Sequence, residues 1–343
     1  MPRLAQTPGW DGDEGYNLEI ARRLAEGHAQ AFAVSQSFVQ HPAGFYALLA
    51  PVTAAFGADL TVARAAAALC SSLVAGVLYL SARRGHGERA AILGALVFAV
   101  AHYIVLHNRF AYTYNLLLLW TALTLWCVTR AEETSSRRWW VGGVVSAACG
   151  LLTDQVGIAL PCFVALRALP DLPRATVSLG AALAPAALFH LAMGLISPQA
   201  ALEDWTQSLS RVTLEAPGVA GGPAARVALW FVNYFHLLRA EWWWPAAVSG
   251  LFCVPELRAR RRLLTLTGAI VVPTFALREI DPFFRTAIPL FVPGALGLGA
   301  LLDAGLSAVF RTVPGAVARS VVAALVVIFP LGLEAARSAG QVA

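Results

Sequence analysis

The sequence predicts an all-α polytopic membrane protein, a bundle of transmembrane helices with further helices at the outer membrane interface. Of its 343 residues, 58% are hydrophobic and only 13% are charged. The mean hydropathy is +0.65, far from that of an average soluble domain. Apolar runs of about 15 to 22 residues recur, long enough to cross a hydrocarbon core of about 30 Å. Because lipid offers the backbone no hydrogen-bond partners, such runs form helices rather than open strands.

The apolar runs predict about ten transmembrane spans. One further segment, 226–238, is apolar but interrupted by Asn233 and His236, so it forms either an eleventh span or a helix at the interface. The interfacial helix is favoured, because the arginine pattern described next requires an even number of crossings there. The expected spans are about 62–82, 90–107, 113–130, 139–153, 156–169, 176–197, 241–256, 263–278, 286–303 and 318–335.

Arginine placement orients this bundle, because loops rich in positive charge stay on the cytoplasmic side. Arginines cluster in alternate loops, so the loops between them are expected to be extracytoplasmic, in a multi-pass protein of a bacterial inner (plasma) membrane. The tryptophans Trp242, Trp243 and Trp244 fit an aromatic belt at the outer interface. The arginine-bearing loops lie at 83–89, 130–138, 167–174, 258–262 and 311–319.

This orientation divides the chain into four expected parts. No apolar segment precedes the first part, and Met1 to Gln6 is not a signal peptide. We therefore expect an upstream first span to be missing from this sequence. The parts are an extracytoplasmic loop with interfacial helices and the candidate catalytic residues (1–61), a transmembrane core (62–197), an extracytoplasmic loop with an interfacial helix (198–240) and C-terminal transmembrane helices (241–343).

The charged and sulfur-containing residues exclude several kinds of site. All 25 basic residues are arginine, which excludes a Schiff-base lysine and a phosphate-loop lysine and leaves guanidinium groups as phosphate ligands. GC-rich coding explains the bias equally well. The arginines form no basic face, so no nucleic-acid partner is expected despite the net charge of +5. The five cysteines lie in apolar runs without CxxC spacing, as buried hydrophobic residues do.

The most polar part of the chain is its opening, where Asp11, Asp13 and Glu14 bring three carboxylates into four residues. A short amphipathic segment follows, with Leu18, Ala21 and Leu24 at helical spacing. This arrangement predicts a reactive loop held at the bilayer surface. The alternative is a solvated acidic turn, or an N-cap for the helix that starts near Tyr16.

The motifs of the first half of the chain, taken in order, resemble those of GT-C membrane glycosyltransferases. The branch is the glycosyltransferase family 39-like one, which includes bacterial relatives of protein O-mannosyltransferases and the lipid A aminoarabinose transferase. The resemblance covers roughly residues 10–170 and weakens afterwards, where only Phe284-Arg285 and Pro289 are similar. Its motifs are Asp13-Glu14-Gly15-Tyr16, His41-Pro42-Ala43-Gly44-Phe45-Tyr46, Val62-Ala63-Arg64, His107-Asn108-Arg109-Phe110-Ala111 and Gly150-Leu151-Leu152-Thr153.

The resemblance implies transfer of a sugar from a polyprenyl-phosphate donor to a glycan, lipid or protein acceptor on the extracytoplasmic face, with membrane lipids around the protein. No cofactor is expected, and the residues do not indicate a divalent metal, although one is possible. Asp13 stands where the family keeps its catalytic aspartate, and Glu14 is the second catalytic candidate. A general base is needed to take the proton of the acceptor hydroxyl. The candidate donor-phosphate ligands are Arg64, Arg109 and Arg285, and the candidate cavity residues are Asp11, Tyr16, His41, His107 and Asp154.

Several candidates have a structural alternative. Arg64 and Arg109 could be interface anchors whose charge reaches the headgroups, and Arg285 could pair with Glu279 or Asp281. Asp154 could cap the next span instead of lining a cavity. His102 and His107 are spaced for metal binding, but two ligands do not make a site. His41 before Pro42 could be a turn residue.

One departure from the family is the absence of an acidic residue in Ser35–Gln40, just before His41-Pro42. Glu14 or Asp154 could substitute, or the site could work with a single base. The rival functions are a transporter or flippase for a lipid-linked sugar and a non-catalytic membrane subunit. A transporter predicts an internal repeat and ionisable groups near the membrane midplane. Here the ionisable residues gather at span ends, which favours the transferase.

Overall fold

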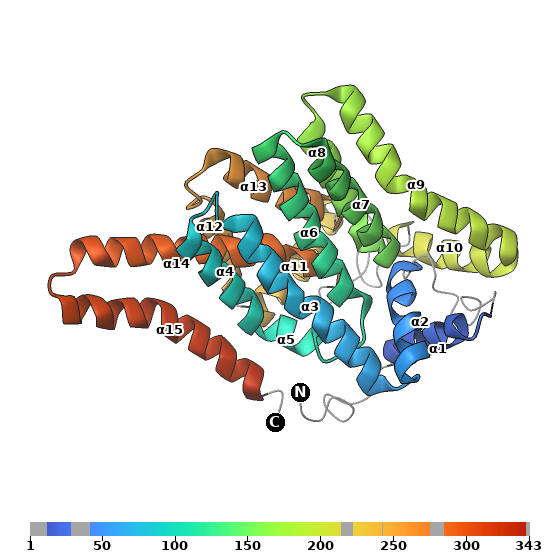
Figure 1. The fold of residues 1–343 in the computed structure, drawn as a ribbon, viewed down its shortest axis with the longest axis horizontal. Coiled ribbons are helices and arrows are strands. Elements are labelled where there is room, and N and C mark those ends of the chain that lie inside the picture. Colours follow the sequence, from blue (N-terminus) through green and yellow to red (C-terminus); the bar gives the residue numbers. More distant parts are fainter. Residues whose placement is uncertain (1–11, 29–41, 214–221, 242, 275–284, 341–343) are drawn as a thin grey trace.

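The computed structural model describes residues 12–28, 42–213, 222–241, 243–274 and 285–340. Throughout this described part the regular elements are helices, which confirms the predicted all-α fold class (Figure 1). The elements are α1 (Gly12–Ala25), α2 (Gly44–Phe56), α3 (Leu60–Ala82), α4 (Glu88–Val100), α5 (His102–His107), α6 (Thr113–Thr134), α7 (Arg137–Thr153), η2 (Gln155–Ile158), α8 (Ala159–Ala168), α9 (Leu172–Ile196), α10 (Pro198–Thr213), α11 (Pro223–Ala240), α12 (Trp244–Leu251), α13 (Leu257–Thr274), η3 (Arg285–Leu290), α14 (Phe291–Thr312) and α15 (Ala316–Gly340).

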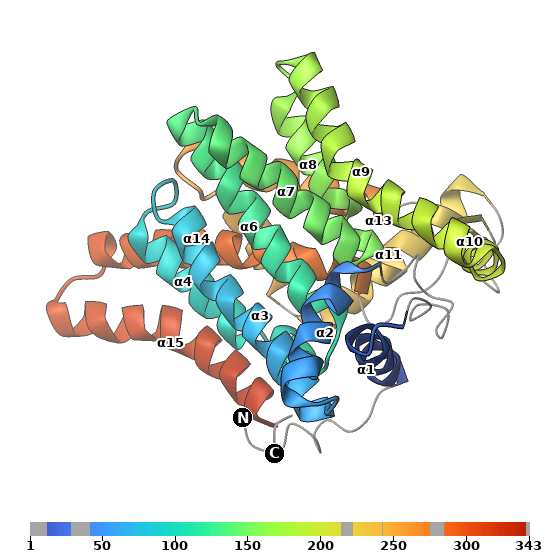
Figure 2. The ribbon, with the colours of Figure 1, turned by 45° about the vertical axis from the view of Figure 1, so that its right-hand side comes forward.

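Two amphipathic helices, α1 and α2, lie side by side at one end of the bundle (Figures 1 and 2). Ile20 and Ala21 of α1 pack with Phe45, Tyr46 and Leu49 of α2 in a second hydrophobic core, to which α3, α6, α9 and α10 also contribute. The helices bury these side chains because apolar residues recur at helical spacing on one face of each. The short interfacial segments predicted ahead of the first span are therefore helices, and they pack on the bundle.

The bundle proper begins at α3, whose N-terminus is capped by Asp59, and its carboxylate accepts the backbone N–H of Thr61 at 2.7 Å. Hairpins of neighbouring helices, α3 with α4 and α6 with α7, form the centre of the molecule. On the other side α14 packs between α4 and α12, while α15 lies at the edge (Figure 1). Most of the hydrophobic core comes from these central helices.

Glycines set how closely α14 approaches its neighbours. A Cβ atom at Gly299 would lie 2.5 Å from the backbone nitrogen of Gly94 on α4. On the facing side of α14, Gly297 meets the backbone of α12 at Ala247 and Gly250. Only residues without a side chain allow backbones to come this close. The glycines of α14 therefore serve helix packing.

Two predicted spans are interrupted. The span predicted over 90–107 is divided into α4 and α5 at Ala101, whose ψ of 120° is not helical. The break frees backbone N–H groups at the start of α5, and Glu241 accepts that of Tyr103 at 2.6 Å. In the span predicted over 241–256, the described residues are helical only in α12, which ends at Leu251, four residues before Pro255.

Four helices of the described part are long and apolar enough to cross a membrane. They are Leu60–Ala82, Leu172–Ile196, Ala287–Thr312 and Ala316–Arg337. The other predicted spans coincide with shorter or less apolar helices, so the number of crossings stays a prediction, as does the four-part division of the chain. The segment 226–238 is helical within α11.

Four of the five arginine-rich loops, all but 311–319, meet at one end of the bundle and connect its helices. Glu132 at the end of α6 accepts Arg167 of α8 at 2.7 Å and Arg262 of α13 at 3.2 Å. Its neighbour Glu133 lies 3.5 Å from Arg84, beyond α3. The opposite end of α6 begins at Thr113, about 30 Å away at 1.5 Å per residue. That length matches a hydrocarbon core, so α6 separates an arginine-rich end from the end that carries α1 and α2.

Candidate active site

The candidate residues meet at the end of the bundle where α6 begins. Helix α1 supplies Asp13 and Glu14, the first turns of α3 supply Arg64, the 107–112 segment lies before α6, and Asp154 follows α7. These positions are up to about 140 residues apart in the sequence. The fold brings them together because α3, α6 and α7 are neighbours and α2 packs across their ends. Figure 2 shows α1 and α2 at this end.

Glu14 and Arg64 form a fully buried ion pair, with both side chains at 0% exposure. Arg64 donates from Nε to Oε1 at 2.8 Å and from Nη2 to Oε2 at 2.6 Å, a bidentate geometry. The backbone N–H of Ala111 also donates to Glu14 Oε1, at 2.7 Å. The pair therefore fastens α1 to α3 and to the segment before α6.

These contacts differ from the roles expected of the two residues. A carboxylate whose oxygens already accept three hydrogen bonds is poorly placed to take a further proton from an acceptor. A guanidinium that is buried and directed at Glu14 is likewise poorly placed to bind a donor phosphate. The geometry instead gives Glu14 and Arg64 a structural role, because each neutralises the charge of the other where water is excluded.

Asn17 and Tyr46 extend this attachment of α1. Asn17 donates from Nδ2 to the carbonyl of Ala111 at 2.9 Å, and its Oδ1 accepts the hydroxyl of Tyr46 at 2.9 Å. Ala111 is thus bound through its N–H by Glu14 and through its carbonyl by Asn17. Neither the backbone nor the side chains at this junction are left without a hydrogen bond.

Asp13 and Asp154 both act on Tyr46. Burial raises the pKa of the Tyr46 hydroxyl above its ordinary value, and the negative charges of Asp154 and then of Asp13 raise it further. Asp13 is half-buried on the first turn of α1, and Asp154 is 2% exposed. The negative charges of α1 and of the residue after α7 therefore both act on one phenol.

Asp154 has the contacts of a cap as well as a place in the site. Its Oδ1 accepts the N–H of Val156 at 2.9 Å, which caps η2, and its Oδ2 accepts the hydroxyl of Thr113 at 2.8 Å. The two roles expected for Asp154, a helix cap and a residue of the candidate site, are thus compatible. Thr113 is the first residue of α6, so Asp154 links the starts of α6 and η2.

Aromatic rings surround His107, and Arg109 is buried nearby in the sequence. His107 is 6% exposed, its Nδ1 lies 3.0 Å from the carbonyl oxygen of Tyr103, and the two rings are 4.0 Å apart at their centroids. Arg109 is also 6% exposed. Asn115 holds the loop between them and α6 by donating to the carbonyls of His107 and Phe110. The loop that carries Arg109 is therefore ordered from within.

The remaining candidates are exposed or lie outside the described residues. Tyr16 is 55% exposed on α1. Asp11 and His41 lie outside the described residues, and so does the side chain of Arg285, whose backbone begins η3. In the part of the chain that the structure describes, no three His, Cys, Asp or Glu side chains are grouped as metal ligands.

Sequence reasoning missed three of the residues that build the site. Asn17 lies four positions after Asp13 and three after Glu14, which puts it on their face of α1, and this spacing was the available signal. Asn115 and Glu241 had no such signal. Their partners are backbone groups of a loop and of α5, which depend on where the chain bends.

Residues 40–201 match the family model described as dolichyl-phosphate-mannose-protein mannosyltransferase. No curated protein matches the sequence. Among solved structures, ArnT from Cupriavidus metallidurans bound to undecaprenyl phosphate matches with a TM-score of 0.66 at 18% identity, over 96% of this chain and 70% of that one. The Archaeoglobus fulgidus oligosaccharyltransferase AglB, in complex with an inhibitory peptide and a dolichol-phosphate, matches with a TM-score of 0.55 at 13% identity, over 96% of this chain and 51% of that one.

The chain thus spans most of the length of ArnT and about half that of AglB. The matches agree with the family predicted from the ordered motifs and support the predicted class of enzyme, a glycosyltransferase with a polyprenyl-phosphate donor. The predicted resemblance is confirmed: the chain is a multi-pass membrane protein with the fold of the GT-C glycosyltransferases.

Proposed function

We propose that this protein transfers a sugar from a polyprenyl-phosphate donor to the hydroxyl of an acceptor, with Asp13 as the general base. The observation that carries the proposal is the attachment of α1. Glu14 and Asn17, one and four residues after Asp13 on α1, bind Arg64, Tyr46 and the backbone of Ala111. Asp13 is thereby kept half-buried, near Tyr46, while its neighbour Glu14 makes the contacts that attach α1 to the bundle.

The roles follow from the chemistry of transfer. The acceptor oxygen attacks the anomeric carbon, its proton passes to the Asp13 carboxylate, and the bond from that carbon to the donor phosphate oxygen breaks. Negative charge then grows on the leaving polyprenyl phosphate, and a guanidinium stabilises it. Arg109 is our candidate for this contact, and Arg285 remains a second one. Glu14 and Arg64 are positioning residues in this scheme.

The family match and the relatives support the choice of donor. The ArnT crystal structure has undecaprenyl phosphate bound, and the AglB structure is a complex with a dolichol-phosphate. A donor of this class keeps its chain in lipid and its phosphate at the interface, as a site at the end of the bundle requires. We further propose that this end faces the extracytoplasmic side of a bacterial inner membrane, because the arginine-rich loops lie at the other end. The acceptor is a glycan, a lipid or a protein.

The test is single-turnover sugar transfer and donor binding by the purified full chain, with undecaprenyl-phosphate-linked sugar as donor. Asp13→Asn keeps the size of the side chain but removes the base, and should lower turnover roughly 10²–10⁴-fold with donor affinity unchanged. Arg109→Gln should instead weaken donor binding, on the order of 2–5 kcal/mol. Glu19→Gln, on the outer face of α1, is the matched control and should change neither.

Normal turnover by Asp13→Asn would remove the base from the scheme. Loss of turnover in the Asp13 variant together with an equal loss of donor binding would make Asp13 a binding residue. Movement of the donor across a vesicle membrane without sugar transfer would favour the alternative function, a flippase.

A further inference from the structure

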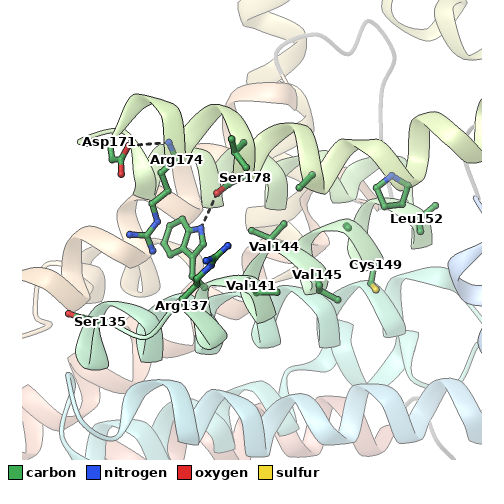
Figure 3. Close-up of a pocket in the computed structure, with 15 residues that line it drawn as sticks. Ser135, Arg137, Val141, Val144, Val145, Cys149, Leu152, Asp171, Arg174 and Ser178 are labelled. Atoms are coloured by element: carbon green, nitrogen blue, oxygen red, sulfur yellow. Dashed lines mark hydrogen bonds between the residues drawn. The ribbon is translucent and has the colours of Figure 1, made fainter.

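A groove of about 740 Å³ lies between α7 and α9, outside the candidate active site. Figure 3 shows its walls, with Val141, Val145 and Cys149 on α7 and Ser178 on α9. The two helices are fixed to each other across its floor, where Trp140 Nε1 donates to Ser178 Oγ at 2.9 Å. The groove is therefore a formed feature of the fold, because both floor residues are buried and hydrogen-bonded.

One end of the groove is positively charged. Arg137 at the start of α7 and Arg174 near the start of α9 line it, and both are exposed. The guanidinium of Arg174 stacks on the indole of Trp140, with its central carbon 4.0 Å from the ring centroid, which holds the charge at the groove mouth. Asp171 also lies here, and one of its oxygens accepts the backbone N–H of Arg174 at 3.1 Å. The mouth thus carries two cations and one anion.

The rest of the groove is apolar. Beyond Trp140 its lining on α7 continues to Leu152 and on α9 to Pro185. Val145 and Val177 are 54% and 71% exposed, so the lining faces the surroundings of the bundle rather than its core. From Arg137 to Leu152 the groove follows α7 for about 22 Å at 1.5 Å per residue, more than the roughly 15 Å depth of one leaflet of hydrocarbon.

We propose that this groove binds an anionic phospholipid of the surrounding bilayer, with its phosphate at Arg137 and Arg174 and one acyl chain along α7 and α9. A cationic mouth followed by an apolar channel matches a ligand with an anionic head and a hydrocarbon tail. Basic pockets between transmembrane helices are where such headgroups bind. Guanidinium groups suit the phosphate, because they donate two parallel hydrogen bonds to it.

The groove mouth and the candidate active site lie at opposite ends of the same helix. Arg137 begins α7, and Asp154 follows its last residue. The headgroup of the proposed lipid is therefore about one hydrocarbon thickness from the donor phosphate. This distance distinguishes the groove from the site of sugar transfer, so its occupant is a second lipid.

Native mass spectrometry of the delipidated full chain in detergent tests the proposal. The probes are dioleoyl phosphatidylglycerol, which is anionic, and dioleoyl phosphatidylcholine, which carries no net charge. We expect the anionic lipid to bind more tightly than the neutral one. Arg137→Gln and Arg174→Gln should each lower the affinity for the anionic lipid about fivefold, since each arginine near the membrane surface contributes about that factor. Arg138→Gln is the matched control, because Arg138 neighbours Arg137 but does not line the groove.

A second pair of variants tests the tail. Ala181 lines the groove and is exposed, so Ala181→Trp should fill the groove without disturbing the core. It should lower the affinity for the anionic lipid at least tenfold. Leu188→Trp, at an exposed position of α9 outside the lining, should not. A melting curve that matches the parent shows that each variant is folded.

Three results would overturn the proposal. Equal binding of both lipids would show that the arginines do not select a headgroup. Unchanged binding by Ala181→Trp would mean that the lipid lies on the surface rather than in the groove. Displacement of the phospholipid by equimolar undecaprenyl phosphate, with loss of that binding in the arginine variants, would make the groove a donor-lipid site.

Discussion

Replacing Glu14 by glutamine removes the negative charge that the buried guanidinium of Arg64 faces. Both side chains are 0% exposed, so water cannot take over the lost contact. Glutamine keeps an oxygen that can accept the N–H of Ala111, which Glu14 now accepts at 2.7 Å. The substitution therefore tests the ion pair more than the shape of the junction.

The magnitude follows from burial. Removing one partner of a buried pair leaves an uncompensated charge and costs about 3–5 kcal/mol. We expect Glu14→Gln to lower the free energy of unfolding by that amount. Arg64→Met should lower it by a comparable amount, because the Glu14 carboxylate is then buried without its cation. The double variant has neither charge of the pair left, so its loss should be smaller than the sum of the two by about 2–3 kcal/mol.

The assay is equilibrium unfolding in mixed detergent micelles, followed by circular dichroism, for the parent and the three variants. The control is Glu19→Gln on the same helix, whose partner Arg22 lies 2.8 Å away but is 41% exposed. An exposed pair should contribute less than about 1 kcal/mol. Losses at Glu14 and Arg64 that add up within about 0.5 kcal/mol would refute the reasoning, because independent sites are additive.

Three further predictions concern packing, pH and orientation. Gly299→Val should lower the free energy of unfolding by about 1–3 kcal/mol because it forces α14 away from α4. Gly180→Ala should not, because no atom lies within 4 Å of its Cβ position, and thermal melting compares the two variants. Hydrogen bonds from Arg22, then Arg23, lower the pKa of Glu19 from 4.5 to about 2. Its stabilising contribution is therefore full above pH 4.5 and lost as the pH falls towards 2, and Glu19→Gln should flatten the pH dependence of unfolding there. Gly12→Cys in intact cells should react with an impermeant thiol reagent and Arg84→Cys should not, and the reverse pattern would invert the proposed orientation.

The arrangement of the site could be predicted only in part. Asp13, Arg109 and Asp154 were found through the order of family motifs along the chain, and the structure brings their segments to one end of the bundle. The partnership of Glu14 with Arg64 joins residues 50 positions apart, and that of Glu14 with Ala111 joins residues 97 apart. Nothing in local spacing distinguishes such a buried pair from two separate functional groups, because either use requires the same charges.

The sequence by itself determined that this chain is a bundle of membrane helices, because hydropathy acts residue by residue and lipid permits the backbone few alternatives. It also determined that the ionisable residues gather at the ends of the helices, since charge is excluded from the hydrocarbon between them. Only the tertiary structure decided where helices break, as at Ala101, where Glu241 accepts the N–H of Tyr103. It likewise decided that the Glu14 carboxylate is buried in an ion pair with Arg64 and is not free. The physical reason is the same in both cases: a buried polar group needs a partner, and which partner it finds depends on how distant helices pack.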